Sequence, residues 1–224
     1  MIEMRDVGFA YPREEALFQG IALELPRGSF HFLTGPSGSG KTTFLRLCIA
    51  DLLPTQGRLS LFGQDAAGLG RDAIAGLRRR VGVVHQDTQF LDHLPVAENI
   101  ALPMTVAGQP VDMQAIRDLL AWVQMGPQAR AMPPALSGGE RQRAALARAV
   151  ILSPDVILAD EPTGNLDWDM SLRLLQLLIE LNRSGKTVLI ATHDLNLIRA
   201  AKQQVSARVL RIAGGRLQAA GAEL

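Results

Sequence analysis

The chain has 224 residues, of which 47 % are hydrophobic and 4 % aromatic, so it is long enough to bury a substantial core. Its 23 Lys and Arg against 22 Asp and Glu give a formal net charge of +1, and this balance argues against a dedicated nucleic-acid-binding protein. The single cysteine, Cys48, excludes an intrachain disulfide, and no apolar run reaches the roughly 20 residues that span a bilayer. With no signal peptide visible, the chain is expected to be soluble and cytoplasmic.

Short strands joined by turns are predicted for residues 2–34. A polar stretch at 12–15 separates a strand over 4–9 from an alternating strand over 21–25, and the apolar run 30–34 predicts a buried strand. An apolar helix is predicted over 43–50. The segment between this strand and this helix therefore lies at the carboxyl end of a strand.

Residues 35–43 match the phosphate-binding pattern G-x-x-x-x-G-K-[ST]. Glycines allow the tight turn that points successive N–H groups into one anion site, and the helix N-terminus adds partial positive charge. Lys41 can reach the β- and γ-phosphates of a nucleotide, while the Thr42 hydroxyl can ligate Mg²⁺. The alternative is a glycine-rich turn that happens to carry a lysine. The predicted nucleotide-binding residues here are Gly35, Pro36, Ser37, Gly38, Ser39, Gly40, Lys41, Thr42 and Thr43.

Further along the chain, strands are predicted over 58–63 and 80–84. The pattern is helical from 96 to 124, with interruptions near Pro103, Gly108 and Pro110, and again over 139–152. Strand, helix and strand then alternate over 156–159, 171–181 and 187–191, and a last strand covers 207–212. Such alternation favours a parallel sheet covered by helices, with a helix-rich insertion at roughly 90–150.

The predicted strand 156–159 ends in two carboxylates, Asp160 and Glu161. Acidic side chains belong only at the exit of a strand that is buried on both faces, and this exit is where open α/β sheets bind ligands. Asp160 is therefore expected to hold Mg²⁺ through water, and Glu161 to orient or deprotonate an attacking water. An ordinary acidic turn before Pro162 is the alternative.

Residues 136–140 read Leu-Ser-Gly-Gly-Glu and precede the helix predicted over 139–152. Ser137 is suited to cap that helix, and Gly138 and Gly139 leave its N–H groups accessible to an anion. Together with the phosphate loop and the Asp160–Glu161 strand, this segment resembles the signature of the ATP-binding-cassette (ABC) ATPases. The resemblance covers essentially the whole chain.

The family resemblance implies an α/β fold of the ABC type. It comprises a P-loop NTPase core with a mainly parallel sheet, an N-terminal antiparallel β subdomain and an α-helical subdomain. We expect a single domain over 1–224, with the core and β subdomain in 1–89 and 153–224 and the helical subdomain in 90–152.

The resemblance also implies site residues beyond the phosphate loop. Tyr11 resembles the aromatic that stacks on adenine, although an edge-strand tyrosine is the alternative. Gln86 resembles the glutamine that touches Mg²⁺ and the attacking water, and Asp167 lies in a loop that communicates across a dimer. His193 resembles the switch histidine at the γ-phosphate, whereas a lone histidine before Asp194 is more often simply a residue at a helix start.

The family mechanism implied is a head-to-tail dimer with ATP between Lys41 of one subunit and Ser137, Gly138 and Gly139 of the other. Residues 160–167 resemble the group that includes the cell-division ATPases of the FtsE type, the lipoprotein-release ATPase and the macrolide-type exporters. The short chain and residues 191–198 resemble most closely the ATPases of the FtsE type. These lie at the inner face of the plasma membrane through an integral membrane partner, FtsX, and ATP cycling is thought to activate cell-wall hydrolases. Lipoprotein-release or macrolide-type exporters are the second reading. His85, where the family usually has an aromatic, puts the partner in question.

Other classes fit the residues less well. Soluble ABC ATPases of DNA repair or translation usually carry two cassettes or long coiled coils, and this chain has one phosphate loop and no heptad array. A small-molecule kinase would not account for Ser137-Gly138-Gly139.

Overall fold

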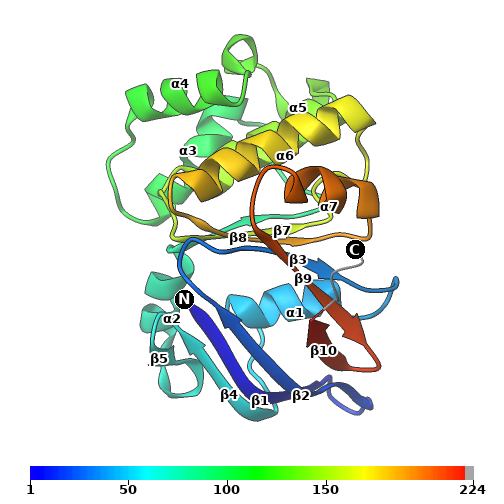
Figure 1. The fold of residues 1–224 in the computed structure, drawn as a ribbon. Coiled ribbons are helices and arrows are strands. Elements are labelled where there is room, and N and C mark those ends of the chain that lie inside the picture. Colours follow the sequence, from blue (N-terminus) through cyan, green and yellow to red (C-terminus); the bar gives the residue numbers. More distant parts are fainter. Residues whose placement is uncertain (220–224) are drawn as a thin grey trace.

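The main sheet of the computed structural model, which describes residues 1–219, has six strands in the order β10-β9-β3-β8-β7-β6 (Figure 1). Five of them are parallel, and β10 pairs antiparallel to β9 at one edge. Every residue of the three central strands is buried, as expected where both faces are covered. The strands are β3 Phe30–Thr34, β6 Val81–Val84, β7 Val156–Asp160, β8 Thr187–Ala191, β9 Ala207–Ala213 and β10 Arg216–Ala219.

A smaller antiparallel sheet has the order β2-β1-β4-β5. Its strands are β1 Ile2–Ala10, β2 Ala16–Leu25, β4 Gln56–Leu61 and β5 Gln64–Asp65. Helix α1, Lys41–Cys48, lies between this sheet and the main one, and its buried face carries Phe44 edge-on to Phe18 of β2 at 6.1 Å between ring centroids (Figure 1). The buried apolar residues between the two sheets form a first core, which holds α1, the helix after the phosphate loop, against both sheets. Cys48 is buried in it, and burial raises the pKa of its thiol.

The opposite face of the main sheet is covered by helices (Figure 1). A second core joins their apolar faces to Phe30, Phe32 and Ile190 of the sheet. These helices are α3 Val96–Val106, α4 Met113–Trp122, α5 Gly138–Val150, α6 Trp168–Arg183 and α7 Leu195–Lys202. The predicted parallel α/β core is thus confirmed. The boundaries of the helical subdomain at residues 90 and 152 stay a prediction.

The prediction that Pro103 interrupts the helical region is wrong. Helix α3 runs through Pro103 to Val106, and the Ala107 N–H donates to the Pro103 carbonyl at 2.9 Å. A proline removes one N–H donor and crowds the carbonyl four residues earlier, but this one lies in the last two turns, and the residues after it still form helical bonds. The break falls instead at residues 107–112, which include Gly108 and Pro110.

Four of the helices and strands were not predicted from the sequence. They are α2 Arg71–Arg78, α7 and the edge strands β5 and β10. Each is only two to eight residues long, which is too short for a clear apolar period. The segment 217–224 is weakly patterned, and its last five residues lie outside the described residues. Within 1–219, no helix is long and apolar enough to cross a membrane.

His31 is a buried histidine in β3, 2 % exposed, whose Nδ1 has no hydrogen-bond partner. Burial, together with repulsion from Arg208, lowers its pKa from 6.5 to about 4. As the pH falls, the His31 imidazole is protonated in the unfolded chain at about pH 6.5, but in the folded chain only at about pH 4. The free energy of unfolding therefore decreases from about pH 6.5 downward.

His31→Leu is accordingly expected to reduce the acid sensitivity of the fold. Between about pH 7.5 and about pH 5.5, the wild type should lose about 1 kcal/mol more unfolding free energy than the variant. Urea denaturation at the two pH values measures this difference. The exposed His93→Leu serves as control, and an equal loss in wild type and His31→Leu would contradict the assignment.

Candidate active site

The phosphate loop connects β3 to α1, as the sequence predicts. Gly38 and Gly40 have φ of 77° and 93°, a region that side chains with a Cβ rarely adopt. A Cβ at Gly40 would also come within 2.7 Å of the Phe18 ring. The loop therefore needs glycine at residue 40 both for its backbone conformation and for its packing.

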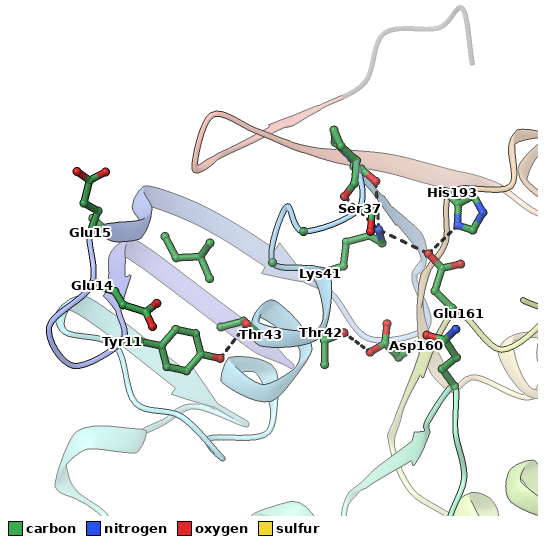
Figure 2. Close-up of a pocket in the computed structure, with 17 residues that line it drawn as sticks. Tyr11, Glu14, Glu15, Ser37, Lys41, Thr42, Thr43, Asp160, Glu161 and His193 are labelled. Carbon is green, nitrogen blue, oxygen red and sulfur yellow. Dashed lines mark hydrogen bonds and ion pairs between the residues drawn. The ribbon is translucent and has the colours of Figure 1, made fainter.

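Lys41 is the first residue of α1, and its ammonium group points back over the loop (Figure 2). Its Nζ donates to the Gly35 carbonyl at 3.1 Å and to the Pro36 carbonyl at 3.4 Å, and it lies 3.5 Å from Glu161 Oε1. The charge is thus held at the centre of the loop, facing the carboxyl end of β7.

Two polar pairs lie beside the phosphate loop: one connects the loop to the carboxyl end of β7, and the other connects the residues that follow β7 and β8 (Figure 2). The Thr42 hydroxyl donates to Asp160 Oδ2 at 2.6 Å, and His193 Nδ1 lies 2.9 Å from Glu161 Oε1. Glu161 has a φ of 42°, unusual for a residue other than glycine, and its N–H donates to the Ala191 carbonyl at 2.8 Å. This backbone conformation is held by pairing with the neighbouring strand, and it turns Glu161 toward Lys41 and His193.

One open cavity of about 1010 Å³ brings most of the predicted site residues together. It is lined by Tyr11, by Gly35, Pro36, Ser37, Gly38, Gly40, Lys41, Thr42 and Thr43, and by Gln86, Asp160, Glu161 and His193. Ser39 does not line it; its hydroxyl is buried without a partner beside Gly35. Sequence reasoning missed Glu14, Glu15, Ala16 and Leu17, which also line the cavity, because no motif marks them.

Tyr11 lies at the far end of this cavity from Glu161 (Figure 2). Its ring packs edge-on against Phe9 with 5.0 Å between centroids, and its hydroxyl is 3.0 Å from Thr43 Oγ1. The ring is therefore fixed at the wall of the cavity, and both predicted roles remain open to test.

We expect Tyr11→Ala to weaken ATP binding about tenfold if the ring stacks on adenine, since base–aromatic stacking is worth about 1–3 kcal/mol. Tyr11→Phe should then bind within about twofold of wild type, because it keeps the ring. Calorimetric titration of the two variants with ATP measures this. Equal losses in both would show that the hydroxyl bond to Thr43 matters and not stacking.

The signature residues lie elsewhere on the chain. Ser137 caps α5 in a reciprocal capping box, with the Glu140 N–H donating to Ser137 Oγ at 3.3 Å and the Ser137 N–H donating to Glu140 Oε2 at 2.8 Å. The bond that Glu140 Oε2 accepts from the Ser137 N–H, followed by the bond that it accepts from the Ser137 hydroxyl at 2.7 Å, lowers the pKa of Glu140. Ser137, Gly138, Gly139 and Asp167 do not line the cavity of their own chain, and Asp167 instead caps α6 by accepting from the Met170 N–H.

The chain is similar in sequence to known proteins. Residues 18–164 match the family model described as ABC transporter. The cell division ATP-binding protein FtsE of Bacillus subtilis (strain 168) is 41 % identical over 209 residues, covering 92 % of each chain. FtsE of Escherichia coli (strain K12) is 40 % identical over 219 residues, covering 97 % of each.

Solved structures agree with this likeness. A dimeric post-hydrolysis state of the ATP-binding cassette MJ0796 bound to ADP and Pi has a TM-score of 0.86 and 29 % identity, covering 98 % of each chain. A second dimeric MJ0796 structure, of a bacterial ABC transporter cassette, has a TM-score of 0.87 and 31 % identity, covering 97 % of each. The predicted ABC ATPase fold is confirmed. This chain belongs to the ABC transporter family and is one of its ATP-binding, ATP-hydrolysing cassettes.

Proposed function

We propose that this ATPase acts in cell division, as a subunit of the FtsE type that drives an integral membrane partner resembling FtsX to regulate cell-wall hydrolysis. One observation carries the enzymatic part of the proposal. A single cavity holds the phosphate loop, the Thr42–Asp160 pair and the Glu161–His193 pair. The role in division is supported by 38–42 % identity to relatives named FtsE.

The proposed roles follow from where each group lies. Loop N–H groups and Lys41 would hold the β- and γ-phosphates, with the negative charge facing the N-terminus of α1. Glu161 would take the proton of the attacking water, since it is the carboxylate nearest to Lys41. His193 would hold Glu161 and reach the γ-phosphate, and Gln86, which lines the same cavity, would orient the water.

Mg²⁺ fits the oxygen donors at this site. The part of the chain described here, residues 1–219, contains no cluster of three or more His, Cys, Asp or Glu side chains suited to a metal. Mg²⁺ differs from most metals in that it commonly uses one or two protein oxygens, with water and substrate phosphates completing the shell. Thr42, Asp160 and Gln86 would hold it, and the bound ion would neutralise charge that develops on the phosphates.

ATP-dependent dimerisation would complete the site. Ser137, Gly138 and Gly139 form an anion-binding helix start that lies outside the cavity of its own chain. A head-to-tail second copy would place it on the γ-phosphate, with Asp167 in the loop between the two sites. Trp168 and Leu195, 46 % and 41 % exposed, line a second cavity of about 450 Å³ with Glu161 and His193, and such apolar exposure beside a reactive group suits burial by a second copy.

Attachment to the membrane would come through the partner, at the cytoplasmic face. A pull-down with Glu161→Gln, ATP and Mg²⁺ from gently solubilised membranes tests this, with Glu180→Gln as the control for loss of one carboxylate on the surface of α6. A small membrane protein with a large extracytoplasmic loop and links to cell-wall hydrolases is the expected co-purifying partner. A lipoprotein- or drug-export permease would replace the division role with the exporter alternative, and the lack of any membrane partner would contradict both.

A further inference from the structure

The segment that carries Gln86 forms the joint between the main sheet and the helical layer. It leaves β6 at residue 85, lines the nucleotide cavity at Gln86 and reaches α3 at Val96. The Gln86 amide lies close to Gly164, three residues after Glu161, since a Cβ placed on Gly164 would be 3.7 Å from Gln86 Nε2. The orientation of this segment therefore decides where the Gln86 amide sits relative to the reacting groups.

Helix α5 holds this segment through its main chain. The Gln142 amide donates from Nε2 to the Gln86 carbonyl at 2.8 Å, and Arg148 Nη1 donates to the Gln89 carbonyl at 2.7 Å. The Arg148 guanidinium also lies 4.6 Å from the centroid of the Phe90 ring. Two polar side chains of one helix thus fix the first part of the segment, at Gln86 and at Gln89.

Asn99 of α3 holds the continuation of the segment. This side chain, 0 % exposed, accepts from the Leu91 N–H at 2.8 Å and donates to the Leu94 carbonyl at 2.8 Å. The stretch from Gln86 to Leu94 is therefore hydrogen-bonded to helices α5 and α3. The chain connects it to the main sheet through β6.

Gln142 makes this bond at a cost to the fold. It is 7 % exposed, and its Oε1 is buried with no partner. An apolar residue of the same length would avoid the unsatisfied carbonyl, so the amide at this position is not there for stability. Its one contact that reaches the active site is the carbonyl of Gln86.

The same helix begins with the signature residues. Ser137, Gly138 and Gly139 form the N-terminus of α5, and Gln142 follows one turn later. We propose that Gln142 and Arg148 are positioning residues which make the signature end of α5 and Gln86 move as one body, so that engagement of ATP by α5 sets the position of Gln86. This inference rests on the proposed ATP-dependent dimer, because only a second copy would bring the signature end to a phosphate.

The first test compares Gln142→Met with wild type. The variant should lower kcat about tenfold, the loss expected for one hydrogen bond that acts in the transition state, while KM for ATP stays within about twofold. Its melting temperature should change little, because removal of the unsatisfied Gln142 Oε1 offsets loss of the hydrogen bond to the Gln86 carbonyl. Unchanged kcat, or a loss of kcat that only parallels a loss of stability, would overturn the proposal.

Two further variants sharpen this comparison. Arg148→Lys keeps the charge but loses the planar fork over Phe90, and it should lower kcat in the same direction. Asn182→Leu is the matched control, because Asn182 also donates to two main-chain carbonyls, those of Gly28 and Lys186, but lines no part of the nucleotide cavity. It should change the melting temperature and leave kcat unchanged.

Hydrogen exchange in the Glu161→Gln background separates this inference from the proposal beneath it. With ATP and Mg²⁺, amides at 137–140 and at 86–90 should both become protected in Glu161→Gln. Adding Gln142→Met should abolish the protection at 86–90 and keep that at 137–140. Protection at 86–90 in both proteins overturns the positioning role, whereas no protection at 137–140 in Glu161→Gln itself overturns the dimer and the inference with it.

Discussion

Glu161→Gln is expected to bind ATP as wild type does, to lose turnover about 10³-fold and to accumulate as a dimer when ATP and Mg²⁺ are present. An amide keeps the size of the side chain and can still accept from His193, but it cannot take a proton from water. The variant removes the ion pair between Lys41 and Glu161 but keeps the bond from Lys41 to the Gly35 carbonyl and the loop N–H groups, so the phosphates should be held as before. ATP hydrolysis and size-exclusion chromatography with and without ATP measure both effects.

The control for this variant is Glu180→Gln, in which the altered carboxylate accepts from Trp122 Nε1 on the surface of α6. It should hydrolyse ATP at the wild-type rate and show no trapped dimer. Normal hydrolysis by Glu161→Gln would contradict the role of Glu161 as base. Loss of turnover without a dimer would retain that role and remove the proposed bridging by ATP.

Two inactive variants are expected to restore turnover when mixed. Lys41→Met removes the ammonium that faces the phosphates, and Gly138→Asp adds a carboxylate at the signature end of α5. The structure has room at Gly138, since a Cβ there would meet only the Asn165 carbonyl at 3.6 Å and Leu166 Cδ2 at 3.9 Å. Gly138→Asp should therefore fold and act by repelling the phosphate.

The recovery follows from the head-to-tail geometry. In a mixed dimer, one site combines the intact Lys41 of the Gly138→Asp chain with the intact signature of the Lys41→Met chain. Random pairing makes half the dimers mixed, and each has one intact site of two, so the mixture should reach about a quarter of wild-type turnover. ATP hydrolysis across a series of mixing ratios measures this. A rate equal to the sum of the two separate variants would contradict a site shared between chains.

Much of the fold was predictable because its signals are local. The buried strands β3, β7 and β8 are continuous apolar runs, and the glycine pattern from Gly35 to Gly40 specifies a turn wherever it occurs. The short helix α2 gave no such signal. Pro103 gave a misleading one, because the helix continues through it to Val106 although a proline weakens a helix.

The site could be predicted only residue by residue. The acidic exit of a buried strand pointed to Asp160 and Glu161, and the family resemblance pointed to His193. No spacing in the sequence indicates that the side chains of Thr42 and Asp160, 118 residues apart, approach within 2.6 Å. The sequence does not point to Leu17 or Gln142 either. An apolar residue and a glutamine in a helix are common in any sequence, and only the structure shows that Leu17 lines the cavity and that Gln142 bonds to Gln86.

The sequence by itself therefore determined that this chain binds a nucleotide on a parallel α/β core, because phosphate binding depends on backbone geometry within nine consecutive residues. The tertiary structure decided which side chains meet there, because β3 lies beside β8, and β8 beside β7, in an order that the chain reaches only by crossing the sheet. It also decided that Ser137 to Gly139 lie outside their own chain's cavity, since α5 packs on the helical face of the sheet.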